Sequence, residues 1–165
     1  MIFGMSISTF TTVHVILSLI GILSGLVVLF GMIGAKNSGS LTALFLVTTV
    51  LTSATGFLFP GAGLDPARIV GIISLVALAA AILAFYDYHL ARWWRWIYVI
   101  GVVVALYLNC FVAVVQAFQK IPVINALAPT QSEPPFLVAQ VVVMVIFIVL
   151  GILAVRKFHP AASRP

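Results

Sequence analysis

Five long runs of hydrophobic residues divide this chain, and short polar or proline- and glycine-containing stretches separate them. The runs cover residues 8–34, 41–59, 69–90, 96–118 and 137–155. Each is close to or above the roughly 20 residues that an α-helix needs to cross a ~30 Å hydrocarbon core. A membrane β-barrel would instead show segments of about 10 residues with alternating polarity. The pattern therefore predicts an all-α integral membrane bundle of five transmembrane helices.

The connections between the runs predict a single domain. We expect one transmembrane domain over residues 1–158, with a long loop at 119–136 that contains four prolines and a disordered tail at 159–165. No basic residue precedes the first run, and the run is longer than the apolar region of a signal peptide. We therefore expect the first span to remain in the mature protein.

The composition agrees with a lipid environment. Hydrophobic residues make up 64% of the chain and charged residues only 7%, against about 25% charged in an average soluble domain. The basic residues that give the net charge of +5 lie outside the apolar runs, between them or after the last one, so they indicate membrane topology rather than a nucleic-acid surface. The lipid bilayer is the expected partner. The single cysteine, Cys110, lies within the fourth run, where we expect it to pack as a small apolar residue.

The distribution of basic residues predicts the orientation. An odd number of spans places the two termini on opposite sides of the membrane. One side collects Lys36, Arg92, Arg95, Arg156, Lys157 and Arg164, and the other collects Arg68 and Lys120. Because Lys and Arg concentrate in cytoplasmic loops, this predicts an outside N-terminus and a cytoplasmic C-terminus in a bacterial inner membrane. The sequence RWWRW then lies at the cytoplasmic interface as an aromatic anchor.

Small residues recur at four-residue spacing within several runs, which is typical of helix faces that pack closely in membranes. The residues expected at these faces are Gly21, Gly25, Thr48, Gly56, Gly101 and Ala105. Such faces also pair between copies of a chain, so we expect a homo-oligomer.

Polar side chains within the spans are costly to bury in lipid, so they are the candidate binding residues. His14 shares a helical face with Ser18, Gly21 and Gly25, and should therefore point into the bundle. The expected ligand-binding residues are His14, Thr52, Thr55, Asn109, Gln116 and Gln140 within the spans and Glu133 in the long loop. The amides have an alternative role as hydrogen-bonding groups that hold helices together. The loop is either a lid over the outer mouth of the bundle or a solvated connection.

His14 raises the question of a cofactor, because imidazole can titrate, relay a proton or bind a metal. A b-type haem usually takes two histidines at similar depth, and only His14 lies clearly within a span. This disfavours bis-histidine haem in one chain and leaves open ligation by two copies of His14, or by His14 and another ligand. The sequence shows no phosphate-binding loop, zinc-protease motif or nucleophile elbow, which disfavours a standard hydrolytic or nucleotide-dependent enzyme.

The stretches TTVLTSATGFLFP, ALYLNCFVAVVQAF and LAPTQSEPPF resemble those of small multi-pass bacterial membrane proteins without an assigned activity. In size and number of spans the chain is also similar to the translocator (tryptophan-rich sensory) proteins, five-helix membrane proteins that bind porphyrins and sterols. Those proteins carry tryptophan throughout their helices, whereas all three tryptophans here lie in RWWRW. The similarity therefore extends to architecture alone.

Three functions remain open from the sequence. The first is binding, sensing or transport of a small lipophilic or amphipathic molecule in a pocket in the outer half of the membrane. The second is a redox-complex subunit that holds haem or quinone through His14. The third is a purely structural subunit of a larger membrane assembly.

Overall fold

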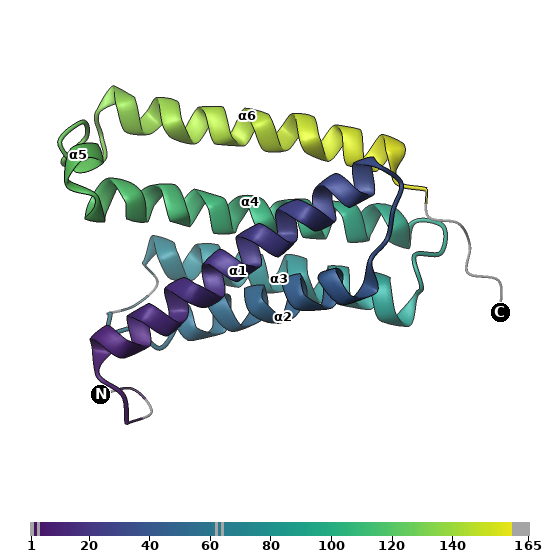
Figure 1. Cartoon of the computed structure of the whole chain (residues 1–165), viewed down its shortest axis with the longest axis horizontal. Coiled ribbons are helices and arrows are strands. Elements are labelled where there is room, and N and C mark those ends of the chain that lie inside the picture. The colour runs from purple at the N-terminus through teal and green to yellow at the C-terminus, as the bar shows by residue number, and fades with distance from the viewer. Residues whose placement is uncertain (1, 3, 62, 64, 160–165) are drawn as a thin grey trace.

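The computed structural model describes residues 2, 4–61, 63 and 65–159, and nearly all of them form an all-helical bundle. Its elements are α1 (Ile7–Ile33), α2 (Gly39–Gly56), α3 (Pro66–Ile82) with the π-helical turn η1 (Leu83–Asp87), α4 (Trp94–Lys120), the short α5 (Pro122–Asn125) and α6 (Pro134–Lys157) (Figure 1). Five of these helices, with α3 and η1 counted together, are long and apolar enough to cross a membrane. No strand occurs in the described ranges. The all-α prediction with five candidate spans is confirmed.

Several helices begin earlier than the apolar runs suggest, because capping residues extend them. Asp65 accepts a hydrogen bond from the backbone N–H of Arg68, and Pro66 occupies the first helical position of α3. Pro134 likewise opens α6 after Glu133. A proline fits the first turn of a helix, where its missing N–H has no partner to lose. Some of the prolines that we expected in loops, such as Pro66 and Pro134, therefore begin helices.

The spans also end differently from the expected boundaries. The second span ends at Gly56 rather than near residue 59, and the third ends with η1 at Asp87. His89 and Leu90, which follow η1, have φ angles of 45° and 59°. This left-handed backbone is incompatible with a continuing α-helix. The connection between α4 and α6 is residues 121–133, shorter than the expected 119–136 at both ends.

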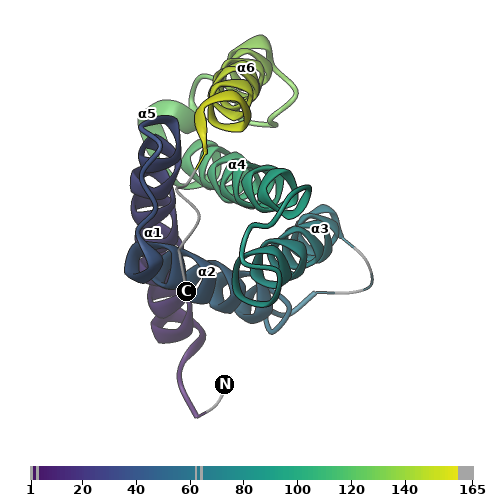
Figure 2. The same ribbon diagram turned by 90° about the vertical axis from the view of Figure 1, so that its right-hand side faces the viewer.

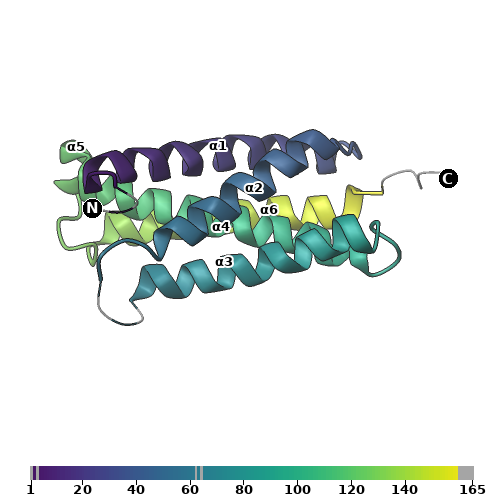
Figure 3. The same ribbon diagram turned by 90° about the horizontal axis from the view of Figure 1, so that it is seen from below.

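Helix α4 lies at the centre of the arrangement. It packs against α1, α3 and α6, while α2 packs against α1 and α3. The end-on view shows α4 between α6 and α3, with α6 on the outside of the bundle (Figure 2). The view from below shows α2 crossing between α1 and α3 (Figure 3). Since α1 begins and α6 ends at opposite ends of the bundle, the two ends of the described chain lie on opposite sides (Figure 1).

The buried core draws residues from all five long helices, and glycines lie at its closest helix contacts. A Cβ atom on Gly25 would lie 2.7 Å from side-chain atoms of both Phe45 and Leu106. One on Gly101 would lie 2.7 Å from the carbonyl oxygen of Ala77 in α3. These two glycines therefore sit at close helix contacts of the kind that small residues permit in membranes. Among the other expected packing residues, Thr48 and Ala105 are buried, whereas Gly56 has only His14 near its missing side chain, at 3.8 Å.

The outer surface of the bundle is apolar. Leu23 of α1, Val76 of α3 and Leu137 of α6 are each more than 60% exposed, and water would not tolerate a continuous surface of such residues. This surface matches a lipid environment. At the C-terminal end the structure describes the exposed His159, while the rest of the predicted disordered tail, with Arg164, lies outside the described residues.

Candidate functional site

His14 is placed against the second span. Its Nδ1 atom lies 2.8 Å from Oγ1 of Thr55, and its ring packs edge-on against Phe59. The Thr55 hydroxyl also donates to the carbonyl oxygens of Leu51 and Thr52. Because that single hydroxyl proton is engaged, the imidazole is best assigned as the donor through Nδ1–H. The Nε2 atom of the half-buried ring then keeps its lone pair available.

A second polar contact lies one turn deeper on α1. The hydroxyl of Ser18 donates to Oδ1 of Asn109 in α4 at 2.9 Å. The amide nitrogen of Asn109 and the hydroxyl of Thr49 are buried without a hydrogen-bond partner in the described part of the chain. Both lie beside Gly21, at 3.2 and 3.0 Å from the place that a Cβ atom would occupy. Gly21 therefore leaves room for a small polar layer between α1, α2 and α4.

The other expected site residues make local contacts of their own. Thr52 donates to the carbonyl oxygen of Thr48 within α2. Gln140 of α6 donates to the carbonyl oxygen of Phe111 in α4, and so joins two helices. Gln116 reaches only Gln119, at 3.5 Å on the exposed side of α4. The polar residues thus form separate hydrogen-bonded groups, and the helix-joining alternative describes Asn109 and Gln140 well.

The long loop folds back onto α4. Asn125 donates to the carbonyl oxygen of Phe118 at 2.8 Å, and Gln131 donates to that of Val115 at 3.0 Å. Ala128 of the loop is fully buried, and the ring of Phe118 packs edge-on against Phe136 at the start of α6. Helix α5 contacts α4 and no other helix. The loop therefore caps the end of α4, while most of its residues are exposed.

Glu133 organises the end of this loop. Its carboxylate accepts hydrogen bonds from the backbone N–H and the hydroxyl of Thr130 and from the backbone N–H of Ser132. Desolvation opposes ionisation, but the hydrogen bonds together outweigh it and lower the pKa of Glu133 below its usual value. Both carboxylate oxygens accept hydrogen bonds, so Glu133 stabilises the turn into α6.

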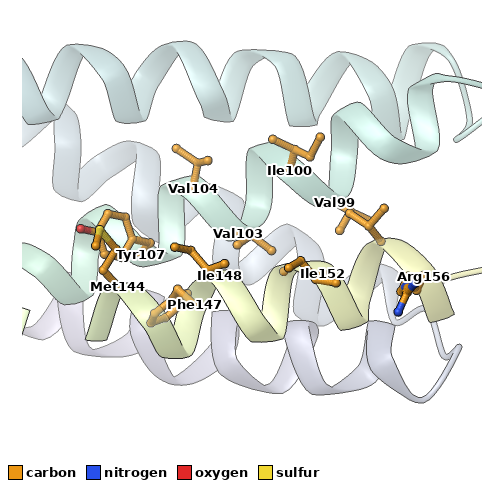
Figure 4. A pocket seen from close by; sticks show the side chains of 12 residues that line it. Val99, Ile100, Val103, Val104, Tyr107, Met144, Phe147, Ile148, Ile152 and Arg156 are labelled. Carbon is orange, nitrogen blue, oxygen red and sulfur yellow. The ribbon is translucent and has the colours of Figure 1, made fainter. Parts of the chain in front are cut away.

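A groove lies between α4 and α6, and none of the expected binding residues lines it (Figure 4). Its volume is about 540 Å³, and its lining consists of Val99, Ile100, Val103, Val104, Tyr107, Met144, Phe147, Ile148, Gly151, Ile152, Val155 and Arg156. The polar groups of this lining are the Tyr107 hydroxyl towards one end and the Arg156 guanidinium at the other. The groove was not predicted from the sequence, because most of its lining consists of valine and isoleucine residues like those of any apolar span. Gly151, the single glycine of α6, is the one local signal.

The aromatic cluster lies at the same end of the bundle as Arg156. Arg95 donates to the carbonyl oxygen of Phe158, which directly follows α6, and its guanidinium lies 5.8 Å from the ring centroid of Trp96. Tyr88 and Trp94 stack at 3.6 Å. Arginine, tyrosine and tryptophan side chains of this kind are typical of the membrane–water interface. The composition of the cluster is therefore that of an interfacial anchor.

The described residues contain no group of three or more His, Cys, Asp and Glu side chains that could hold a metal ion. His14 lies near the start of α1, whereas His89 lies in the connection from η1 to α4 at the opposite end of the bundle (Figure 1). Cys110 is partly buried and unpaired. Within one chain, His14 and His89 thus do not lie at the similar depth that two axial ligands of one haem would need.

A comparison of the chain with protein-family models, curated proteins and solved structures finds no significant match. The similarity to the translocator proteins stays a prediction. Arguments about function therefore rest on the geometry of this chain.

Proposed function

We propose that this protein is a multi-pass membrane protein that binds a small lipophilic or amphipathic molecule in the groove between α4 and α6. The observation that supports this function is the groove itself. Its volume of about 540 Å³ falls within the range of roughly 300–1,000 Å³ that is typical of small-molecule sites. Such sites are predominantly apolar with a few polar groups that orient the ligand, and Tyr107 and Arg156 fill that role here.

The position of the groove favours a ligand that arrives from the bilayer. Ile100, Ile148 and Ile152 line it and are each more than 50% exposed on the outer surface of the bundle. In a membrane these side chains face lipid, so the groove opens sideways into the hydrocarbon. A molecule with an apolar body can enter it without crossing water.

The groove replaces the outer-half pocket as the place of binding. Of the polar residues expected there, Asn109 and Gln140 join helices through their hydrogen bonds, whereas Thr52 and Gln116 bond within their own helices. The groove instead runs towards the C-terminal end of α6, where the basic residues gather. With a cytoplasmic C-terminus in a bacterial inner membrane, that end faces the cytoplasm.

Filling the groove tests the function. We expect Ile148→Trp to lower the retention of phosphatidylcholine by the detergent-purified protein, measured by native mass spectrometry, to less than half of the wild-type level. Ile146→Trp is the matched control, because Ile146 is also exposed on α6 and does not line the groove. Gly151→Leu fills the groove from the same wall about one helical turn further along α6, since its Cβ atom would lie 3.2 Å from Val103 on the α4 wall. If both groove variants retain as much lipid as the control, the proposal is wrong.

A further inference from the structure

We propose that the occupant of the groove is an anionic phospholipid, with one acyl chain between α4 and α6 and its phosphate bound by Arg156. This inference rests on the proposed function and names its ligand class. It combines the depth of the groove in the membrane with the position of a single guanidinium group.

The length of the groove matches one leaflet of a bilayer. Its lining on α6 runs from Met144 to Arg156, which at 1.5 Å per residue corresponds to about 18 Å along the helix axis. Half of a hydrocarbon core of ~30 Å is about 15 Å. The groove therefore reaches from near the bilayer midplane, at Met144 and Tyr107, to the headgroup level at Arg156 (Figure 4). A single acyl chain of one leaflet would fill it.

The neighbouring aromatic cluster supports this assignment of depth. Arg95 joins that cluster to the end of α6 through the carbonyl oxygen of Phe158. Because tryptophan and tyrosine rings concentrate where hydrocarbon meets water, the last turn of α6 lies at the same level as the phosphates of the lipid.

Arg156 provides the charge that complements an anionic headgroup. Its side chain is exposed and forms neither a hydrogen bond nor an ion pair with another residue of the described chain. Arg68, by contrast, donates to the carbonyl oxygens of Phe59, Gly61 and Gly63. A guanidinium binds phosphate through paired hydrogen bonds, and it does so without rearranging any existing contact here. An anionic lipid can then place its acyl chain in the apolar groove and its phosphate against the guanidinium. A neutral apolar molecule would leave the guanidinium without a bound anion.

The experiment measures competition between two lipids that differ in net charge. Wild-type protein is incubated with equal amounts of phosphatidylglycerol and phosphatidylcholine with the same acyl chains, and the retained ratio is read by native mass spectrometry. We expect a preference for phosphatidylglycerol that falls about five-fold in Arg156→Gln, which corresponds to about 1 kcal/mol for one basic residue at the surface. Lys157→Gln is the matched control, because it removes one positive charge at the neighbouring position outside the groove. We expect it to keep the preference.

The outcomes separate this inference from the proposed function. If Arg156→Gln keeps the wild-type ratio, or if Lys157→Gln loses the preference equally, groove-specific recognition of the headgroup is wrong. In either case the proposed function stands as long as Ile148→Trp lowers the retention of both lipids. Displacement of phosphatidylglycerol by millimolar inorganic phosphate would also overturn the inference, because it would show an anion site that needs no acyl chain. We expect no such displacement, and we expect Arg156→Gln to unfold at the wild-type temperature.

Discussion

Gly25 of α1 and Phe45 of α2 approach so closely that a Cβ atom on the glycine would lie 2.7 Å from Cδ2 of the phenylalanine ring. On the other side of Gly25, Leu106 of α4 would meet the same atom at 2.7 Å. Phe45 and Leu106 are both 0% exposed, so neither can move aside without disturbing the core. This one glycine therefore fixes the separation of three helices.

Gly25→Ala should accordingly destabilise the bundle. We expect the free energy of unfolding to fall by about 1–3 kcal/mol, the usual cost of overpacking a filled core. Denaturant titration in detergent micelles measures it. Gly31→Ala on the same helix is the control, because its Cβ atom would meet only the carbonyl oxygen of Lys36 at an ordinary 3.5 Å. Both variants gain the same helix propensity, so equal stabilities would contradict the close contact at Gly25.

Two threonines of α2 should respond in opposite directions to the same substitution. Thr55→Val removes the hydrogen bond to His14, and we expect it to cost about 0.6 kcal/mol, the average for such bonds within membranes. Thr49→Val replaces a buried hydroxyl that has no partner in the described chain, so stability should stay equal or rise.

The same denaturant titrations measure both threonine variants, and a double-mutant cycle with His14→Phe supplies the control. In the His14→Phe background Thr55→Val should lose most of its effect, because the hydrogen bond is already absent. A larger cost for Thr49→Val than for Thr55→Val would show that the polar contacts are assigned to the wrong residues.

The five candidate spans could be predicted from the sequence because lipid imposes a simple requirement on length and polarity. The exact ends could not, since they depend on local chemistry. Asp65 and Glu133 precede prolines that begin helices, and a proline in a sequence reads equally well as a loop residue. The left-handed backbone at His89 and Leu90 gives no sequence signal, because neither is a glycine.

The candidate sites, like the helix boundaries, could be predicted from the sequence only in part. Helical periodicity and depth predict that His14 lies close to Gln116 or to a threonine of the second span, and the structure places Thr55 there. The groove between α4 and α6 could not be foreseen. Valine and isoleucine side chains on facing helices either interlock or leave a space, and the distance between the two helices decides which. The periodicity of a sequence does not predict that distance.

The pH dependence of the long loop follows from Glu133. Its pKa is lower in the folded loop than the ordinary value of 4.5, so its contribution is fully present above pH 4.5 and is lost as the pH falls through the folded value. We expect the amide hydrogen-exchange protection of Thr130 and Ser132, after correction for intrinsic rates, to stay constant from pH 7 to 5 and to decrease below pH 4.5. In Glu133→Gln the protection should be low throughout and independent of pH. A decrease that persists in Glu133→Gln would assign the titration to another group.

The orientation of the bundle decides which leaflet supplies the lipid. In the described chain Lys36 and Arg92 lie in connections and Arg95 lies in the first turn of α4, all at the same end as Arg156 and Lys157. Arg68 and Lys120 lie at the other end. This asymmetry predicts that the end with more basic residues is cytoplasmic.

A reporter fused after Lys157 should therefore be active in the cytoplasm, and one inserted at residues 131–133 should be active outside. Because Arg156 marks the headgroup end of the groove, this result would assign its lipid to the inner leaflet, where anionic headgroups meet the basic end of the bundle. The reverse result would contradict the predicted topology and move the groove to the outer leaflet, while the preference of Arg156 for an anionic headgroup would be tested as before.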